Sequence, residues 1–174
     1  MAKFSVRIAL CVAAAVFISA CTTLVAPYDA TFDKSLNDLS ESTAKFVAAA
    51  SAGGAERSYH SKEAVAYYAS TYNLLDRLTE RAKLSRGILP CPTNENLKDF
   101  ATLPSSTTVL PEDYLKLDCR EFQLYSVRIF ANQLEYSHKN DGVLNKSEAT
   151  ATGGALQRSI LGAIQTFIEN KPSN

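Results

Sequence analysis

Apolar residues recur at spacings of three and four positions in four long stretches of the chain, which is the period of an amphipathic α-helix. The stretches cover about residues 30–52, 61–86, 112–139 and 145–170. None of them has the strict alternation of apolar and polar residues that predicts a β-strand. Two of the connections are short, and the one over residues 87–111 is long. We therefore expect an all-α fold, a four-helix bundle with up-down topology or one crossover connection.

The N-terminus has the plan of a bacterial export signal. Two basic residues precede an apolar run over residues 8–18, which is too short to span about 30 Å of hydrocarbon. The run ends in Ile18-Ser19-Ala20-Cys21, which resembles the lipobox of bacterial lipoproteins. This resemblance covers residues 1–21 only. It implies that residues 1–20 are a signal peptide and that Cys21 is the lipidated first residue of the mature protein. An uncleaved anchor and an ordinary signal peptide cut after residue 20 are the alternatives.

The resemblance also implies a location. Thr22 follows the cysteine, whereas an aspartate at this position tends to keep bacterial lipoproteins at the inner membrane. We therefore expect a lipid anchor in the outer membrane, on the periplasmic side. Residues 21–29 would be the lipidated N-terminus and a short linker, residues 30–170 the helical domain, and residues 171–174 a C-terminal tail. The linker reaches at most about 26 Å, which keeps the domain close to the membrane.

Two cysteines lie in the predicted helical domain, Cys91 and Cys119. In an oxidising periplasm such a pair predicts a disulfide, which would close a loop and pin the long connection over residues 87–111. Loops this long are usually functional or pinned. A reactive or metal-binding thiol pair is the alternative, but the sequence has no C-x-x-C motif and no histidine close to either cysteine.

Charge and motifs argue against several function classes. The chain carries 18 basic and 18 acidic side chains, so no basic excess predicts a nucleic-acid partner. The sequence lacks a G-x-S-x-G motif, an H-E-x-x-H motif and a P-loop. His60 with Glu63, and His138 with Asp141, could form a surface metal site where the second and third helices meet. Two solvated histidines at helix ends are the simpler interpretation. We predict no catalytic residue, no metal and no cofactor.

Tyrosine is the unusual residue of the predicted domain. Tyr114, Tyr125 and Tyr136 recur every 11 positions, which is almost three helical turns, so we expect them to form one stripe on the third helix. The polar edge of the same helix carries Asp118, Glu121, Arg128, Asn132 and Glu135. The second helix carries Tyr59, Tyr67, Tyr68 and Tyr72. Tyrosines of this kind either fill the edge of a core or form an interface. As candidates for a partner surface we take Tyr67, Tyr114, Tyr125 and Tyr136.

These features predict a small lipid-anchored envelope protein that is not an enzyme and that binds a protein partner, acting as an adaptor for an envelope complex. The plan is similar to that of the pilotins of type II secretion systems, which are small lipidated helical domains that escort a secretin to the outer membrane. The similarity is one of architecture, and no pilotin motif matches residue by residue. The alternative is a helical bundle that holds a small apolar ligand or a lipid between its helices.

Overall fold

A computed structural model describes residues 28–87, 90–101 and 108–168. These residues form an all-helical fold without a β-strand, as the periodicity predicts. The α-helices are α2 (Ala30–Ser51), α3 (Lys62–Leu84), α4 (Glu95–Ala101), α5 (Cys119–Asp141) and α6 (Lys146–Ile168). Two short 3₁₀ turns are η2 (Ala55–Arg57) and η3 (Tyr114–Lys116). The lipobox, Cys21 and most of the linker lie outside the described residues. None of the described helices is long and apolar enough to cross a membrane.

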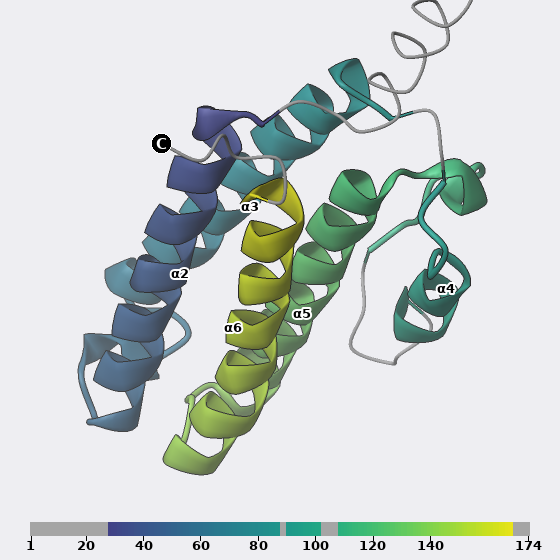
Figure 1. The fold of residues 1–174 in the computed structure, drawn as a ribbon. Helices are drawn as coiled ribbons and strands as arrows, with labels where there is room; N and C mark the ends of the chain where they lie inside the picture. Colours follow the sequence, from purple (N-terminus) through teal and green to yellow (C-terminus); the bar gives the residue numbers. More distant parts are fainter. Residues whose placement is uncertain (1–27, 88–89, 102–107, 169–174) are drawn as a thin grey trace, which may run out of the picture.

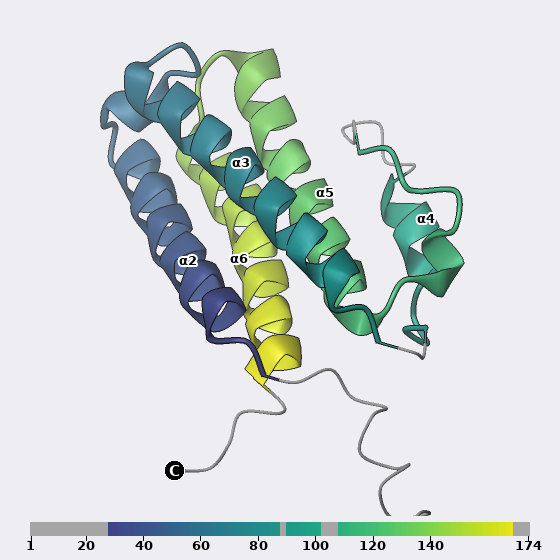
Figure 2. The same ribbon diagram turned by 90° about the horizontal axis from the view of Figure 1, so that it is seen from above.

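The four long helices lie side by side, and the short helix α4 lies outside this group, beside α5 (Figure 1). Helix α6 packs along both α2 and α5, while α3 packs against α5 and more loosely against α2. Helix α4 packs against α5 on the side away from α2 (Figure 2). Helix α2 begins at the end of the molecule where α3 and α6 finish, so neighbouring helices along the chain run in opposite directions.

One core lies between the four long helices. Its fully buried side chains include Phe32, Leu36, Leu75, Leu124, Leu134, Leu156, Ile160 and Phe167. The rings of Phe32 and Phe167 stack with their centroids 4.2 Å apart, which joins the start of α2 to the end of α6. At the opposite end, Phe46 stacks on Tyr67 at 4.0 Å. On helix α6, a Cβ added to Gly153 would lie 2.5 Å from Val47 Cγ2, so the small residue permits close packing against α2.

Polar side chains at the N-termini set where three of the helices begin. The Asp29 carboxylate accepts from the Thr31 N–H at 2.9 Å, and the Ser61 hydroxyl accepts from the Ala64 N–H at 3.0 Å. A capping box formed by Asn145 and Glu148 precedes the last helix, α6. Asn145 Oδ1 accepts from the Glu148 N–H at 3.0 Å, and Glu148 Oε2 accepts from the Asn145 N–H at 3.4 Å.

The prediction of a helix beginning at residue 112 is wrong, because α5 begins at Cys119. Before it, the turn η3 ends at Lys116, and Leu117 and Asp118 are extended. The Asp118 carboxylate accepts from the N–H groups of Arg120 and Glu121, and the Glu121 carboxylate accepts from the Asp118 N–H. This second capping box satisfies the first donors of α5 and fixes its start.

The long connection between α3 and α5 contains the helix α4 and the predicted disulfide. Cys91 and Cys119 are bonded in the structure, and their Cα atoms lie 4.6 Å apart. A second, smaller hydrophobic cluster surrounds this disulfide and consists of Cys91, Leu97, Leu117, Phe122 and Ile129. The Leu117 carbonyl accepts from the Cys91 N–H at 2.8 Å and from Asn94 Nδ2 at 2.6 Å. The connection is therefore held to the start of α5 by covalent, apolar and polar contacts together.

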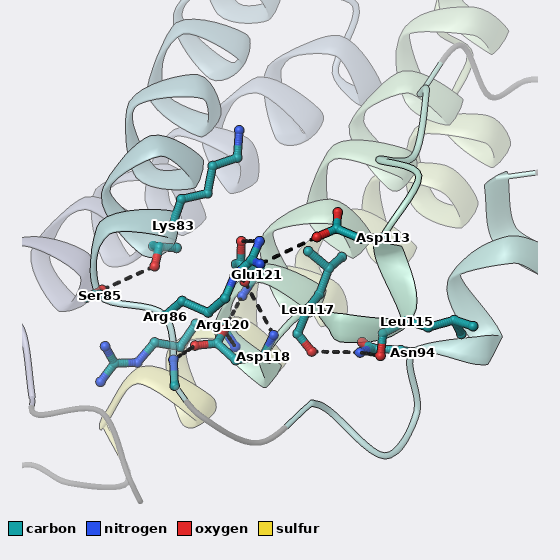
Figure 3. A network of polar contacts seen from close by, with 12 residues as sticks. Lys83, Ser85, Arg86, Asn94, Asp113, Leu115, Leu117, Asp118, Arg120 and Glu121 are labelled. Atoms are coloured by element: carbon teal, nitrogen blue, oxygen red, sulfur yellow. Dashed lines mark hydrogen bonds and ion pairs between the residues drawn. The ribbon is translucent and has the colours of Figure 1, made fainter. Parts of the chain in front are cut away.

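A polar network joins the end of α3 to the start of α5 (Figure 3). The Arg86 guanidinium donates from Nε to Glu121 Oε2 at 2.7 Å and from Nη2 to Glu121 Oε1 at 2.8 Å. Its Nη1 lies 3.6 Å from the Asp113 carboxylate. The Gly87 N–H donates to Asp118 Oδ2 at 2.7 Å. The Glu121 side chain is completely buried, and its negative charge is compensated by the two hydrogen bonds from the Arg86 guanidinium.

Candidate functional site

A cleft of about 520 Å³ lies between helices α3 and α5, beside the short described segment at Thr108 and Val109. Its lining is mostly polar and charged, and comprises Tyr72, Asp76, Thr79, Glu80, Lys83, Thr108, Val109, Tyr125, Arg128, Asn132 and Glu135. The residues from each helix recur at spacings of three and four, so each helix turns one polar face toward the cleft. The Asn132 side chain donates from Nδ2 to the Thr108 hydroxyl oxygen at 2.5 Å, which holds the segment against α5.

Ion pairs already engage most charges of the cleft. The Arg128 guanidinium pairs with the Asp76 carboxylate across the gap between α5 and α3. The guanidinium carbon of Arg128 also lies 5.9 Å from the ring centroid of Tyr72. Lys83 pairs with Glu80 along α3 at 2.7 Å. Among the described residues, no ion pair includes Glu135. Among the charged side chains that line the cleft, the Glu135 carboxylate is therefore the one that forms no ion pair.

Two tyrosine hydroxyls hold the Glu135 carboxylate. Tyr59 donates to Glu135 Oε1 at 3.0 Å, and Tyr72 donates to Glu135 Oε2 at 2.7 Å. Burial raises the pKa of the Tyr72 hydroxyl, and the hydrogen bond and charge of Glu135 raise it further. The same causes raise the pKa of Tyr59. Both hydroxyls therefore stay protonated near neutral pH and act as donors that orient the carboxylate.

A smaller cavity of about 240 Å³ adjoins the cleft. It is lined by Tyr59, Val65, Tyr68, Ala69, Tyr72 and Glu135. Tyr72 and Glu135 belong to the lining of both cavities, so the hollow surface continues along the α3–α5 junction. Val65 at its edge is 55% exposed. The Glu135 carboxylate is the only acidic group among the residues that line this smaller cavity.

His138 lies behind this cavity and is completely buried. Its Nε2 lies 2.9 Å from the Arg57 carbonyl oxygen and its Nδ1 lies 3.0 Å from the Tyr68 hydroxyl. Because a carbonyl can only accept, Nε2 carries the proton, and in the neutral ring Nδ1 accepts from Tyr68. Burial lowers the pKa of His138, against the smaller raising effects of the Arg57 carbonyl and the Glu135 charge. The ring is therefore a neutral structural link between α5, α3 and the turn η2.

The depressed pKa of His138 gives the stability a pH dependence of definite sign. Above the unfolded-state pKa of about 6.5 the ring is neutral in both states, and its contribution is fully present. As the pH falls below that value the unfolded chain binds the proton more readily. The free energy of unfolding should therefore fall, by at most about 1.4 kcal/mol per pH unit from this residue.

Urea denaturation between about pH 8 and pH 5 measures this effect. The variant His138→Gln removes the titrating ring and should flatten the slope in this window. The matched control is His60→Gln, which removes the exposed histidine and leaves in place the part of the slope that His138 causes. An equal slope in the wild-type protein and in His138→Gln would contradict the assignment.

The predicted stripe of Tyr114, Tyr125 and Tyr136 does not form, because Tyr114 lies outside α5, and the fourth candidate for the partner surface, Tyr67, is buried. Tyr67 is 8% exposed, stacks on Phe46 and lies 2.9 Å from the Thr43 hydroxyl, so its assignment to a surface is wrong. Burial raises its pKa to about 12. Tyr114 lies in the turn η3, outside α5, and packs against the second hydrophobic cluster. Tyr125 is half-buried and lines the cleft, and Tyr136 is 41% exposed.

The two histidines come to the same end of the molecule but do not form a metal site. The Tyr59 ring lies between them, with its centroid 5.3 Å from the His60 ring and 5.4 Å from the His138 ring. Both nitrogens of His138 already have partners, and the ring is buried rather than solvated. Across residues 28–87, 90–101 and 108–168, no group of three or more His, Cys, Asp or Glu side chains is arranged to hold a metal ion.

The structure brings together Arg128, Asn132 and Glu135 from the predicted polar edge of the third helix. The remaining two residues of that edge, Asp118 and Glu121, belong instead to the capping network. Sequence reasoning missed the contribution of α3, namely Asp76, Glu80 and Lys83. Their spacing of four and three positions places them on one polar face, which is also the pattern of an ordinary solvated helix.

Comparison with known proteins does not assign the chain to a protein family. No protein-family model matches the chain. No curated protein matches it, and no solved structure matches it either.

Proposed function

We propose that this protein is a lipid-anchored envelope protein that is not an enzyme and that binds a protein partner through the cleft between α3 and α5. The observation that carries the proposal is the cleft itself, in which tyrosines and charges of both signs gather on two facing helices. Tyrosine and arginine are enriched at protein interfaces, where aromatic residues supply contact area, and charges of both signs supply specificity for a partner. The lipobox-like sequence ending at Cys21 supports the anchor and the outer-membrane location.

The finer fold proposal is an up-down four-helix bundle of α2, α3, α5 and α6. It is supported by the side-by-side packing of these helices and by their alternating directions. Asp29 at the start of α2 pairs with Arg81 near the end of α3 at 2.5 Å. In the proposed arrangement this end faces the membrane, and the two turns that contain Gly53 and Gly142 lie at the far end. The cleft then runs along the side of the domain, where an envelope protein can reach it.

The composition of the cleft favours a protein partner over an apolar ligand or lipid. Its lining includes five charged side chains, Asp76, Glu80, Lys83, Arg128 and Glu135. Pockets for small apolar molecules are lined mainly by hydrophobic and aromatic side chains with few polar groups. No specific observation favours the apolar-ligand alternative.

Site-specific photo-crosslinking in cells tests the proposal. The crosslinking residue p-benzoylphenylalanine is placed at Val109 and, separately, at Glu80, which are both exposed and line the cleft. The matched control position is Lys45 on α2, whose side chain is 75% exposed. We expect one and the same envelope protein to be crosslinked from both cleft positions and not from the control. Equal capture from all three positions, or none, would contradict the proposed surface.

A second arm of this experiment tests the anchor. In the Cys21→Ala background the resemblance to lipoproteins predicts an uncleaved precursor or an unlipidated species in the membrane-free fraction. The cleft crosslink should weaken with the loss of anchoring, since the partner is proposed to lie in the envelope. Efficient cleavage with unchanged membrane retention would contradict lipidation and leave the cleft result to stand by itself.

A further inference from the structure

We infer that the smaller cavity beside Glu135 is a binding site for an alkylammonium group. Its lining combines one carboxylate, three tyrosines and two apolar side chains at the edge. This inference goes beyond the proposed function, because it concerns a single chemical group and holds whether or not a protein partner occupies the larger cleft.

The charge argument starts from Glu135. Each of its carboxylate oxygens accepts one tyrosine hydroxyl, and no ion pair among the described residues includes it. The guanidinium of Arg128, on the same helix, is paired with Asp76 instead. A half-buried carboxylate of this kind attracts a cation that can enter the cavity. The two hydroxyls hold it in place beforehand, so a ligand loses little free energy in ordering it.

The geometry favours ammonium over guanidinium. A guanidinium binds a carboxylate best as a fork, with two parallel donors to the two oxygens. In Glu135 one lone-pair direction of each oxygen is already used by Tyr59 or Tyr72. An ammonium group is a compact charge with donors that point in several directions, so it needs no free fork.

The remaining lining suits the rest of such a ligand. Tyr59, Tyr68 and Tyr72 line the cavity together with the carboxylate, and aromatic rings attract cations electrostatically. Tyr72 already has the Arg128 guanidinium 5.9 Å from its ring centroid. Val65 and Ala69 are exposed on α3 at the edge of the cavity, where the methylene chain of an alkylammonium would lie. A lysine side chain of a protein and a free alkylamine share this chemistry.

Titration of the full chain, purified in detergent, with butylammonium chloride tests the inference. The readout is the NMR signals of the tyrosine rings, assigned with Tyr→Phe variants. We expect saturable shifts of the Tyr59, Tyr68 and Tyr72 signals, and no such shifts with 1-butanol or with sodium chloride at equal concentration. Equal shifts with 1-butanol, or no saturable shift, would overturn the inference.

Two variants test separately whether binding needs the Glu135 charge and whether it needs the volume of the smaller cavity. Glu135→Gln keeps the shape and one of the two acceptor oxygens but removes the charge, and it should weaken butylammonium binding at least about tenfold. Ala69→Leu fills the cavity from an exposed helical position and should abolish binding with the charge intact, which keeps the test decisive if Glu135→Gln fails to fold. The matched control is Glu41→Gln, an exposed position on α2, which should bind as the wild type does. Unchanged binding in Ala69→Leu would place the cation elsewhere and overturn the inference.

Comparison of Nα-acetyl-lysine N-methylamide with 1,4-diaminobutane distinguishes the source of the group. Tighter binding of the first supports a lysine side chain of a protein, and tighter binding of the second supports a free amine. Failure of both would overturn the inference. Because these probes need no partner protein, failure here is distinguishable from failure of the crosslinking experiment.

Discussion

Replacing Arg86 by alanine is expected to lower the free energy of unfolding by about 3 kcal/mol. The variant leaves the Glu121 carboxylate, which is completely buried, without the two hydrogen bonds that compensate its charge. Removing one partner of such a pair costs far more than the net value of the pair, because a buried charge is left unpaired. The Arg86 side chain is 34% exposed, so water entering its place moderates the loss to the lower end of the usual range.

Urea denaturation of Arg86→Ala and of the double variant Arg86→Ala/Glu121→Gln measures this. The amide that replaces the Glu121 carboxylate in the double variant carries no charge, so the second substitution should recover part of the loss. Lys83→Ala is the matched control, since it breaks the exposed pair with Glu80 at the end of the same helix and should cost less than about 1 kcal/mol. A cost for Arg86→Ala as small as that of the control would show that Glu121 is solvated.

The ends of the helices were predictable to different degrees, and the local sequence explains why. Helices α2, α3 and α6 lie where the periodicity predicted them, because the local sequence marks their ends. The glycines after residue 52 follow the end of α2, Ser61 caps the start of α3, and Asn145 with Glu148 caps the start of α6. The predicted start of this helix at residue 112 was wrong, because Leu115 and Leu117 extend the helical spacing of apolar residues to positions before α5. In the structure Leu117 lies before α5 and packs in the second hydrophobic cluster. Periodicity indicates which residues share a helical face, but it shows neither that each of them is buried nor against which cluster they pack, and Leu115 is 51% exposed.

The candidate site was predictable only in part, since the residues on one face of a helix do not reveal which helix packs opposite that face. Arg128, Asn132 and Glu135 were recognisable as a polar edge from their spacing alone. Their partners on α3 depend on how the two helices pack, and the local sequence does not contain that information. For the same reason Tyr67 and Tyr72, five positions apart, have different roles. Tyr67 faces Phe46 on α2, whereas Tyr72 faces Glu135 on α5.

Removal of the disulfide between Cys91 and Cys119 is expected to have the largest effect, a loss of about 3 to 4 kcal/mol in the free energy of unfolding. The bond closes a loop of 28 residues in sequence separation, so breaking it gives the unfolded chain many more conformations. The contacts that remain next to it include the apolar packing of Leu97, Leu117, Phe122 and Ile129 and the hydrogen bonds to the Leu115 and Leu117 carbonyls.

The double variant Cys91→Ala/Cys119→Ala, unfolded in urea beside the wild type, measures this loss. Amide hydrogen exchange then separates two ways in which it can arise. If the bond acts through the unfolded state, protection falls across the whole domain, including the core around Leu36 and Leu156. If the connection between α3 and α5 opens by itself, protection falls only around Asn94 and Leu97, and the global loss stays below about 1 kcal/mol. We expect the first result, because Arg86 and Asp118 also tie the end of α3 to the start of α5 and make the connection part of one cooperative unit.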